Sequence, residues 1–223
     1  MGKSLIVSCL LFFALSTQAN TQDPYYEISE VKVEVLSSSQ GFEFTEPDPG
    51  TQVGDVIKIF REIIAFGKEV YKIVEKGKPV INTKYAPISV LPLNTRYGKD
   101  ITSLDLSQWK RPKFVKFKVS YINGYGSEVV AFTYNVNMSY GGNFEGKGSY
   151  IANAQIVPEV ITVAWGYTFN ASMSLVGLTN IGTEDEPIAG ATLQLSYSVA
   201  TIVKEERKNM TIFIAGDGTI QQM

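Results

Sequence analysis

The sequence from Lys113 to Tyr140 reads KFVKFKVSYINGYGSEVVAFTYNVNMSY, and it sets the fold class. Bulky apolar residues stand at every second position on both sides of a turn signal, Asn-Gly-Tyr-Gly, at residues 123–126. A period of two places these apolar side chains on one face of a strand, and Asn-Gly favours a tight reversal of the chain. The stretch therefore predicts an antiparallel β-hairpin with one buried face and one polar face.

The same alternation recurs on both sides of this hairpin. We expect a mainly β protein whose body, residues 78–223, is an antiparallel β-sandwich of about seven or eight strands, the usual size for this architecture. A short N-terminal strand is predicted at Val31–Val35, where valines alternate with charged residues. The other segments with a period of two are Ile161–Leu175, Leu193–Val203 and Ile212–Ile214.

Residues 51–77 carry a different period. Apolar residues, among them Val56, Phe60, Ile63 and Ile64, recur at spacings of three and four, with charged residues between them. This spacing predicts one long amphipathic α-helix. We expect its apolar face to pack on the sheet, because the polar face mixes charges of both signs and lacks the basic excess of membrane-surface helices. Insertion of the helix into a membrane is the alternative.

The N-terminus has the features of a secretory signal peptide. A basic residue precedes an apolar run from Leu5 to Leu15, and small residues lead to a cleavage site near Ala19. The run is too short to span a bilayer, so we expect cleavage and a secreted protein, extracellular or periplasmic. Cleavage would remove Cys9, the only cysteine, and leave a mature chain without disulfides. The predicted organisation is a signal peptide (1–19), an N-terminal strand and acidic linker (20–50), the amphipathic helix (51–77) and the β-sandwich body (78–223).

The composition excludes most catalytic chemistries. The chain has 223 residues, no histidine and a formal net charge of -2. Without histidine, a Ser-His-Asp or Cys-His nucleophile and a histidine-ligated zinc site cannot form. No basic excess is present to neutralise a phosphate backbone, so nucleic acid is not an expected partner. The composition favours a non-enzymatic protein, although two carboxylates would suffice for a hydrolase acting on glycosidic bonds.

Two kinds of residue are candidates for a binding site. Tyr125, in the turn of the hairpin, and Trp109, in a locally basic stretch, are candidate ligand contacts, because their rings combine apolar area with a polar tip. Three successive acids, Glu184, Asp185 and Glu186, form a candidate cation site in a loop, and calcium is the cation that such oxygens favour outside the cell. A solvated acidic loop is the alternative explanation, and no other cofactor is expected.

These observations favour a secreted, non-enzymatic binding or structural protein that acts through its β-sandwich surface on an extracellular ligand or cell-surface component. The first alternative is a membrane-interacting or pore-forming protein that uses the helix at 52–76, and the second is a carboxylate-based hydrolase. Asn137, Asn170 and Asn209 match the N-glycosylation pattern and would carry glycans only in a host that modifies such sites. Neither the ligand nor the oligomeric state follows from the sequence.

Overall fold

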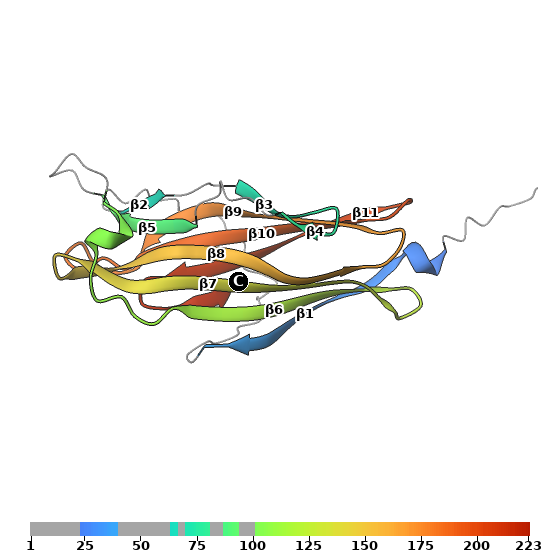
Figure 1. Cartoon of the computed structure of the whole chain (residues 1–223), viewed down its shortest axis with the longest axis horizontal. Coiled ribbons are helices and arrows are strands. Elements are labelled where there is room, and N and C mark those ends of the chain that lie inside the picture. The colour runs from blue at the N-terminus through green and yellow to red at the C-terminus, as the bar shows by residue number, and fades with distance from the viewer. Residues whose placement is uncertain (1–22, 40–62, 67–69, 81–86, 94–100) are drawn as a thin grey trace, which may run out of the picture.

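The computed structural model describes residues 23–39, 63–66, 70–80, 87–93 and 101–223, and the statements below concern these residues. They form two antiparallel six-stranded sheets. The sheets pack face to face as an elongated sandwich, with the strands along its long axis (Figure 1). Their inner faces share one hydrophobic core. The predicted antiparallel, mainly β fold is therefore confirmed. The described residues hold twelve strands, and nine of them lie within residues 78–223, for which seven or eight were expected.

The first sheet has the order β1-β6-β7-β8-β5-β2, and the second has the order β12-β11-β10-β9-β3-β4. Two short 3-10 helices, η1 (Pro24–Tyr26) and η2 (Ser103–Asp105), lie outside the sheets. The strands of the first sheet are β1 (Ile28–Ser38), β2 (Ile63–Phe66), β5 (Ile88–Pro92), β6 (Lys113–Asn123), β7 (Glu128–Phe144) and β8 (Lys147–Val163). Those of the second are β3 (Val70–Glu75), β4 (Lys78–Pro79), β9 (Thr168–Asn180), β10 (Ala189–Ala200), β11 (Glu205–Ala215) and β12 (Ile220–Gln222).

The predicted hairpin forms β6 and β7 and supplies the centre of the core. Phe117 lies opposite Tyr134 in the register of the two strands, and both side chains are fully buried. The rings of Phe132 and Tyr134 stack with their centroids 5.0 Å apart. Phe132 also lies 5.1 Å from the ring of Phe169 on β9, so this contact joins the two sheets. The period of two thus produces the buried face that the sequence predicts.

The predicted helix is wrong over the part that the structure describes. Residues 63–66 form β2 in the first sheet, and residues 70–75 form β3 in the second. Ile63 is 6% exposed and belongs to the core, so its burial was predicted correctly but its secondary structure was not. Val56, Phe60 and the side chain of Ile64 lie outside the described residues. None of the helices within the described ranges is long and apolar enough to cross a membrane.

Backbone pairing explains why strands replace the helix. Strand β2 pairs with β5, and β3 pairs with β9, so these two short segments cover sheet edges that would otherwise be bare. The segments are rich in isoleucine and valine, whose branched side chains suit a strand at least as well as a helix. Short apolar runs do not distinguish the two structures by period alone. The predicted signal peptide and the acidic part of the linker also lie outside the described residues and stay predictions.

Candidate binding surface at one end of the sandwich

One end of the sandwich gathers exposed apolar side chains on neighbouring turns. We call it the aromatic end, and it consists of η1, the β6–β7 turn (124–127), the β8–β9 turn (164–167) and the β10–β11 turn (201–204). Figure 1 shows these turns together at the right-hand end, beside the start of β1. The side chains that stand out into solvent there are Tyr125 (66% exposed), Trp165 (82%), Ile202 (77%) and Val203 (55%).

The buried side chain of Asn123 builds the β6–β7 turn. Asn123 is 1% exposed, and its Oδ1 accepts hydrogen bonds from the backbone N–H groups of Tyr125 (3.1 Å) and Ser127 (3.0 Å). Gly126 supplies the positive φ, +76°, that the reversal requires. The backbone N–H groups of the turn are thus hydrogen-bonded without any contribution from the Tyr125 ring, which stays exposed to solvent. The hydroxyl of Tyr125 donates to Asp23 Oδ1 at 3.3 Å.

The helix η1 ties this turn to the next one. Gly124 N–H donates to the carbonyl of Pro24 at 2.9 Å, and a Cβ at Gly124 would lie 2.8 Å from the Pro24 side chain. The hydroxyl of Tyr25 donates to the backbone carbonyl of Trp165 at 3.0 Å. The hydroxyl of Tyr167 donates in turn to the carbonyl of Tyr25, and burial raises the pKa of Tyr167. The aromatic end is therefore one connected structure.

The β8–β9 turn places Trp165 at its apex. Tyr167 N–H donates to the carbonyl of Ala164 at 3.2 Å, and Gly166 between them has a φ of +80°. A Cβ at Gly166 would lie 3.0 Å from the ring of Tyr26, so both the backbone angle and the close approach favour glycine. The indole of Trp165 packs little and is available for contact.

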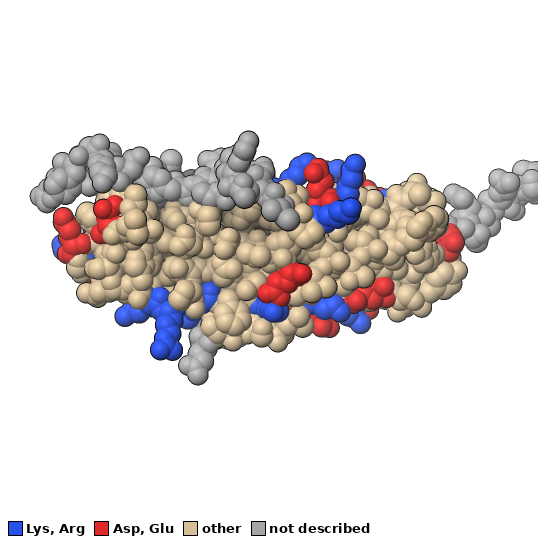
Figure 2. Space-filling view, in the orientation of Figure 1, with Lys and Arg blue, Asp and Glu red and all other residues tan. Residues whose placement is uncertain are grey.

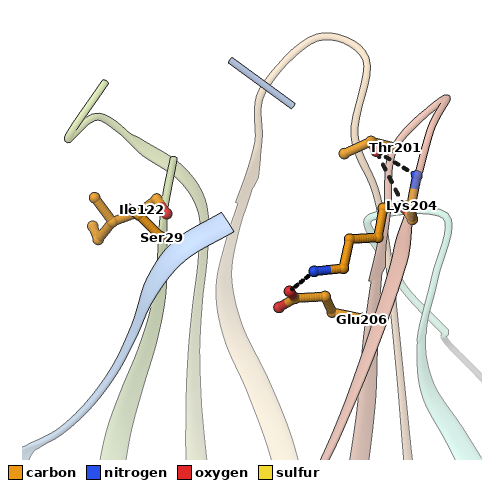
Figure 3. Close-up of polar contacts among 5 residues, drawn as sticks. All are labelled: Ser29, Ile122, Thr201, Lys204 and Glu206. Atoms are coloured by element: carbon orange, nitrogen blue, oxygen red, sulfur yellow. Dashed lines mark hydrogen bonds and ion pairs between the residues drawn. The ribbon is translucent and has the colours of Figure 1, made fainter. Parts of the chain in front are cut away.

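Thr201 builds the β10–β11 turn. Its Oγ1 accepts from the N–H groups of Val203 (3.3 Å) and Lys204 (3.1 Å), and its own N–H donates to the carbonyl of Lys204 at 2.7 Å. Lys204 Nζ forms an ion pair with Glu206 Oε1 at 2.7 Å, as Figure 3 shows. These bonds leave Ile202 and Val203 as the exposed centre of the loop.

The apices of these three turns carry no charged residues, and the charged residues behind the apices are mainly acidic. Residues 124–127, 164–167 and 201–203 include no Asp, Glu, Lys or Arg, and Lys204, the last residue of the third turn, is paired with Glu206. On the face shown in Figure 2, the right-hand end carries acidic but no basic side chains. Glu128 follows the first turn, and contacts with Lys118 and Ser120 lower its pKa. The basic β3–β4 turn stops short of the apices in Figure 1, at the level of Phe169, whose carbonyl accepts from Gly77 N–H.

The start of β1 is fixed to the same end by the side chain of Ser29. Its Oγ donates to the carbonyl of Ile122 at 3.1 Å, across from the Thr201 turn in Figure 3. Behind η1, Ile28 pairs with Asn123 and Val31 pairs with Tyr121. The predicted N-terminal strand is thus confirmed, and it holds η1 in place.

The two predicted aromatic contacts lie at opposite ends of the sandwich. Tyr125 follows the end of β6 and is exposed, whereas Trp109 precedes its start. The indole N–H of Trp109 donates to the carbonyl of Ser103 at 3.2 Å, and the ring covers Gly142, where a Cβ would lie 2.5 Å away. Trp109 therefore packs on the protein, and the structure does not join it to Tyr125 in one site.

The three predicted cation ligands lie in the β9–β10 loop, at the same end as Trp109. Glu184, Asp185 and Glu186 are exposed. Glu186 Oε2 accepts from Gly148 N–H at 3.1 Å, a bond that fixes the loop to the neighbouring hairpin. Within the described ranges, no three His, Cys, Asp or Glu side chains are placed to hold a metal together. Calcium binding by this loop stays an untested prediction.

A second candidate surface is a polar hollow of about 630 Å³ on the outer face of the second sheet. One row of its residues runs across four strands in register, Lys72, Ser172, Ser196 and Asn209. Its one aromatic residue, Tyr197, is 5% exposed and packs inward. The hollow thus offers hydroxyl and amide groups but no exposed ring, and it is a weaker candidate than the aromatic end.

The sequence prediction missed Trp165, Ile202 and Val203. The segment 161–175 reads as one long strand with Trp165 on its buried face, but the chain reverses at Gly166 and continues in the other sheet. Val203 was likewise assigned to a strand and lies in a loop. Gly166, directly after Trp165, is the one local signal that could have revealed the reversal.

Comparison with known proteins adds no further constraint. No family model matches the chain, and neither a curated protein nor a solved structure matches it significantly. The class of protein is therefore defined by its architecture, an antiparallel sandwich of two six-stranded sheets. Its function has to be argued from the chemistry of its surface, because a fold by itself does not imply one.

Proposed function

We propose that the chain is a secreted, non-enzymatic binding protein that contacts its ligand with the aromatic end. The observation that carries this proposal is the exposure of Tyr125, Trp165, Ile202 and Val203 on adjacent turns whose apices bear no charge. Turns normally favour Gly, Asn, Asp, Ser and Pro, which suit both their backbone angles and water. Clustered apolar side chains at such positions contribute little to the core and mark a contact surface.

The construction of the turns supports this proposal. Asn123 and Thr201 satisfy the backbone of their turns, so the exposed side chains are presented by fixed loops on paired strands. Binding residues are commonly found on loops that a rigid scaffold positions in this way. Presentation by fixed loops also reduces the conformational entropy lost on binding.

A hydrolase receives less support from the described residues. Glycoside hydrolysis requires two carboxyl groups about 5–10 Å apart on either side of the bond. The polar hollow on the second sheet is lined by one acid, Glu205, whose carboxylate pairs with Arg207 at 3.0 Å. This arrangement lacks the second carboxylate that the chemistry needs.

Flow cytometry with labelled protein would test the proposal. The chain from Asn20 to Met223 would be compared with a variant that carries Tyr125→Ser, Trp165→Ser, Ile202→Ser and Val203→Ser, on intact bacterial and animal cells. We expect the unsubstituted protein to bind at least one of these cell surfaces and the variant to bind at least about a hundredfold less, since the apolar contact area of all four side chains is removed.

The matched control is Leu104→Ser, which removes a side chain that is 92% exposed in η2, at the other end. This variant should bind as the unsubstituted protein does. Equal binding by the four-residue variant, or no binding of the unsubstituted protein to either cell type, would count against the proposal.

A further inference from the structure

The chemistry of the aromatic end also indicates a class of ligand, and we infer that this ligand is a lipid bilayer with zwitterionic, choline-bearing headgroups. The inference rests on the proposed function and specifies it. It differs from membrane binding by a helix, because the contacts are made by three β-turns and η1.

The side chains exposed at the aromatic end are of the types that enter a membrane interface. Trp and Tyr are the residues that concentrate at the boundary between headgroups and hydrocarbon, because each has an apolar ring and a polar atom. Trp165 and Tyr125 occupy the apices of two turns, and the purely aliphatic Ile202 and Val203 occupy the third. Such a set matches the interfacial layer and the edge of the hydrocarbon beneath it.

The shape of the surface also favours a bilayer. Small-molecule sites are usually concave and enclose most of the ligand, whereas these side chains stand out on separate turns. A standard protein interface buries about 800 Å² on each partner around a packed apolar core. Side chains on separate protruding turns suit a deformable bilayer better than a small molecule or a protein partner, because each side chain can enter the bilayer independently.

The charges around the aromatic end favour a zwitterionic headgroup over an anionic one. Asp23 and Glu27 flank η1, whereas Glu128 is paired with Lys118 and Lys204 is paired with Glu206, so the acidic character of this end comes from Asp23 and Glu27. A surface that carries carboxylates repels anionic lipids. A quaternary ammonium is instead attracted both to carboxylates and to aromatic faces. Asp23 and Tyr125 combine these two features, with carboxylate and phenol in hydrogen-bond contact at 3.3 Å.

The orientation of the sandwich is compatible with end-on contact. The strands run toward the aromatic end, so the body would stand away from the membrane (Figure 1). Along the body, acidic and basic side chains lie near one another in Figure 2. Lys116 and Glu159, for example, form an ion pair at 2.6 Å. The body thus lacks the uniform apolar surface that contact along its length would need.

The two tryptophans of the chain allow a direct test, because each lies at a different end. Trp109→Phe leaves Trp165 as the only indole, and Trp165→Phe leaves Trp109. Phosphatidylcholine vesicles should shift the emission of the first variant to shorter wavelength and leave the emission of the second unchanged. Both variants should be checked for unchanged circular dichroism before vesicles are added.

The electrostatic step is tested by composition and salt. Sedimentation with phosphatidylcholine vesicles should be insensitive to salt, and addition of phosphatidylserine to the vesicles should weaken it. Ile202→Ser should weaken partitioning by about tenfold, the effect expected for one buried aliphatic side chain. Leu104→Ser should have no effect. Free phosphocholine without a bilayer should not reproduce the emission shift.

Three results would overturn the inference: no shift and no sedimentation with phosphatidylcholine, binding only to phosphatidylserine-containing vesicles that salt abolishes, or a full shift with free phosphocholine. Failure here is distinguishable from failure of the proposed function. If the unsubstituted protein ignores phosphatidylcholine but the four-residue variant still loses cell binding, the lipid ligand is rejected and the binding function of the aromatic end stands.

Discussion

The two ends of the sandwich use the same backbone devices and present opposite kinds of side chain. At the aromatic end, Asn123 caps a turn that contains Gly126. At the other end, Asn180 Oδ1 accepts from the N–H groups of Gly182 (2.9 Å) and Ile188 (2.8 Å), and Gly146 turns the β7–β8 hairpin. The exposed residues of this other end are largely charged, and they include Glu145, Lys147, Glu184, Asp185 and Asp217. We call it the charged end.

This difference shows that apolar apices are not needed to build the turns. Asn, Thr and Gly close the loops at both ends, and the residues at the apices are then free to be charged. At the charged end the turn apices are charged, which is the usual outcome for loops in water, and the exposed Leu104 lies in η2, outside these turns. At the aromatic end Tyr, Trp, Ile and Val occupy equivalent positions, which indicates that this end has a role in contact.

The largest expected effect comes from the two tryptophans. Trp109→Ala removes a ring that covers Gly142 and packs against the core, so the free energy of unfolding should fall by about 2–4 kcal/mol. Trp165→Ala removes an exposed ring and should change it by less than about 0.5 kcal/mol. Urea unfolding of the two variants measures both values. Equal losses would mean that the two ends do not differ as described.

The two asparagines provide the next comparison. Asn123→Ala leaves two N–H groups without their acceptor beneath η1, and we expect a loss of about 2–3 kcal/mol in unfolding free energy. Asn180→Ala should cost about 1 kcal/mol, because Asn180 itself is half-buried and water can replace its side chain, whereas Asn123 is 1% exposed. Thermal and urea unfolding would give the difference. A larger loss for Asn180→Ala would mean that the deeper burial of Asn123 does not set the cost of losing these hydrogen bonds.

The two turn glycines should show no difference in stability. Gly126 and Gly146 have φ angles of +76° and +81°, and a Cβ at either would meet no atom within 4 Å. Alanine at either position should therefore cost about 1 kcal/mol, the usual penalty for a side chain in the left-handed region. Urea unfolding of Gly126→Ala and Gly146→Ala tests this equality. A clear inequality would reveal strain that belongs to only one of the ends.

The smallest expected effect is a pH dependence at the aromatic end. Lys118 and Ser120 contact Glu128 at 2.8 and 2.7 Å and lower its pKa, so the charged form is favoured in the folded protein. The resulting stability is present above the ordinary pKa of 4.5 and is lost as the pH falls through the lowered value. Because the pair is substantially exposed, its contribution should stay below about 1 kcal/mol.

Glu128→Gln should remove this contribution. The difference in unfolding free energy between the variant and the unsubstituted protein should therefore shrink between about pH 7 and about pH 3, on the acid side of the carboxyl titration. A difference in unfolding free energy that stays constant over this interval would mean that ionised Glu128 does not stabilise the folded protein.

The strong periods in the sequence explain which parts were predictable. The β6–β7 hairpin combines a period of two over both strands with a local turn signal, and it was predicted correctly, including exposed Tyr125. The prediction of a helix over 51–77 was wrong at Ile63 and at 70–75. The mixed period of this segment fits a helix and a strand equally, and pairing with the free edges of β5 and β9 decides between them. The burial of Ile63 was nevertheless correct, since apolarity does not depend on the secondary structure.

The sequence by itself determined the antiparallel β class, the central hairpin and the lack of histidine chemistry, because these depend on local period and on composition. The tertiary structure alone decided that Trp165, Ile202 and Val203 share one end with Tyr125, although up to 78 residues of chain separate them, as the numbering shows. It also decided that Trp109 packs on Gly142 instead of facing solvent. Exposure and proximity depend on which strands pair and where the chain crosses between sheets, and no local pattern encodes either.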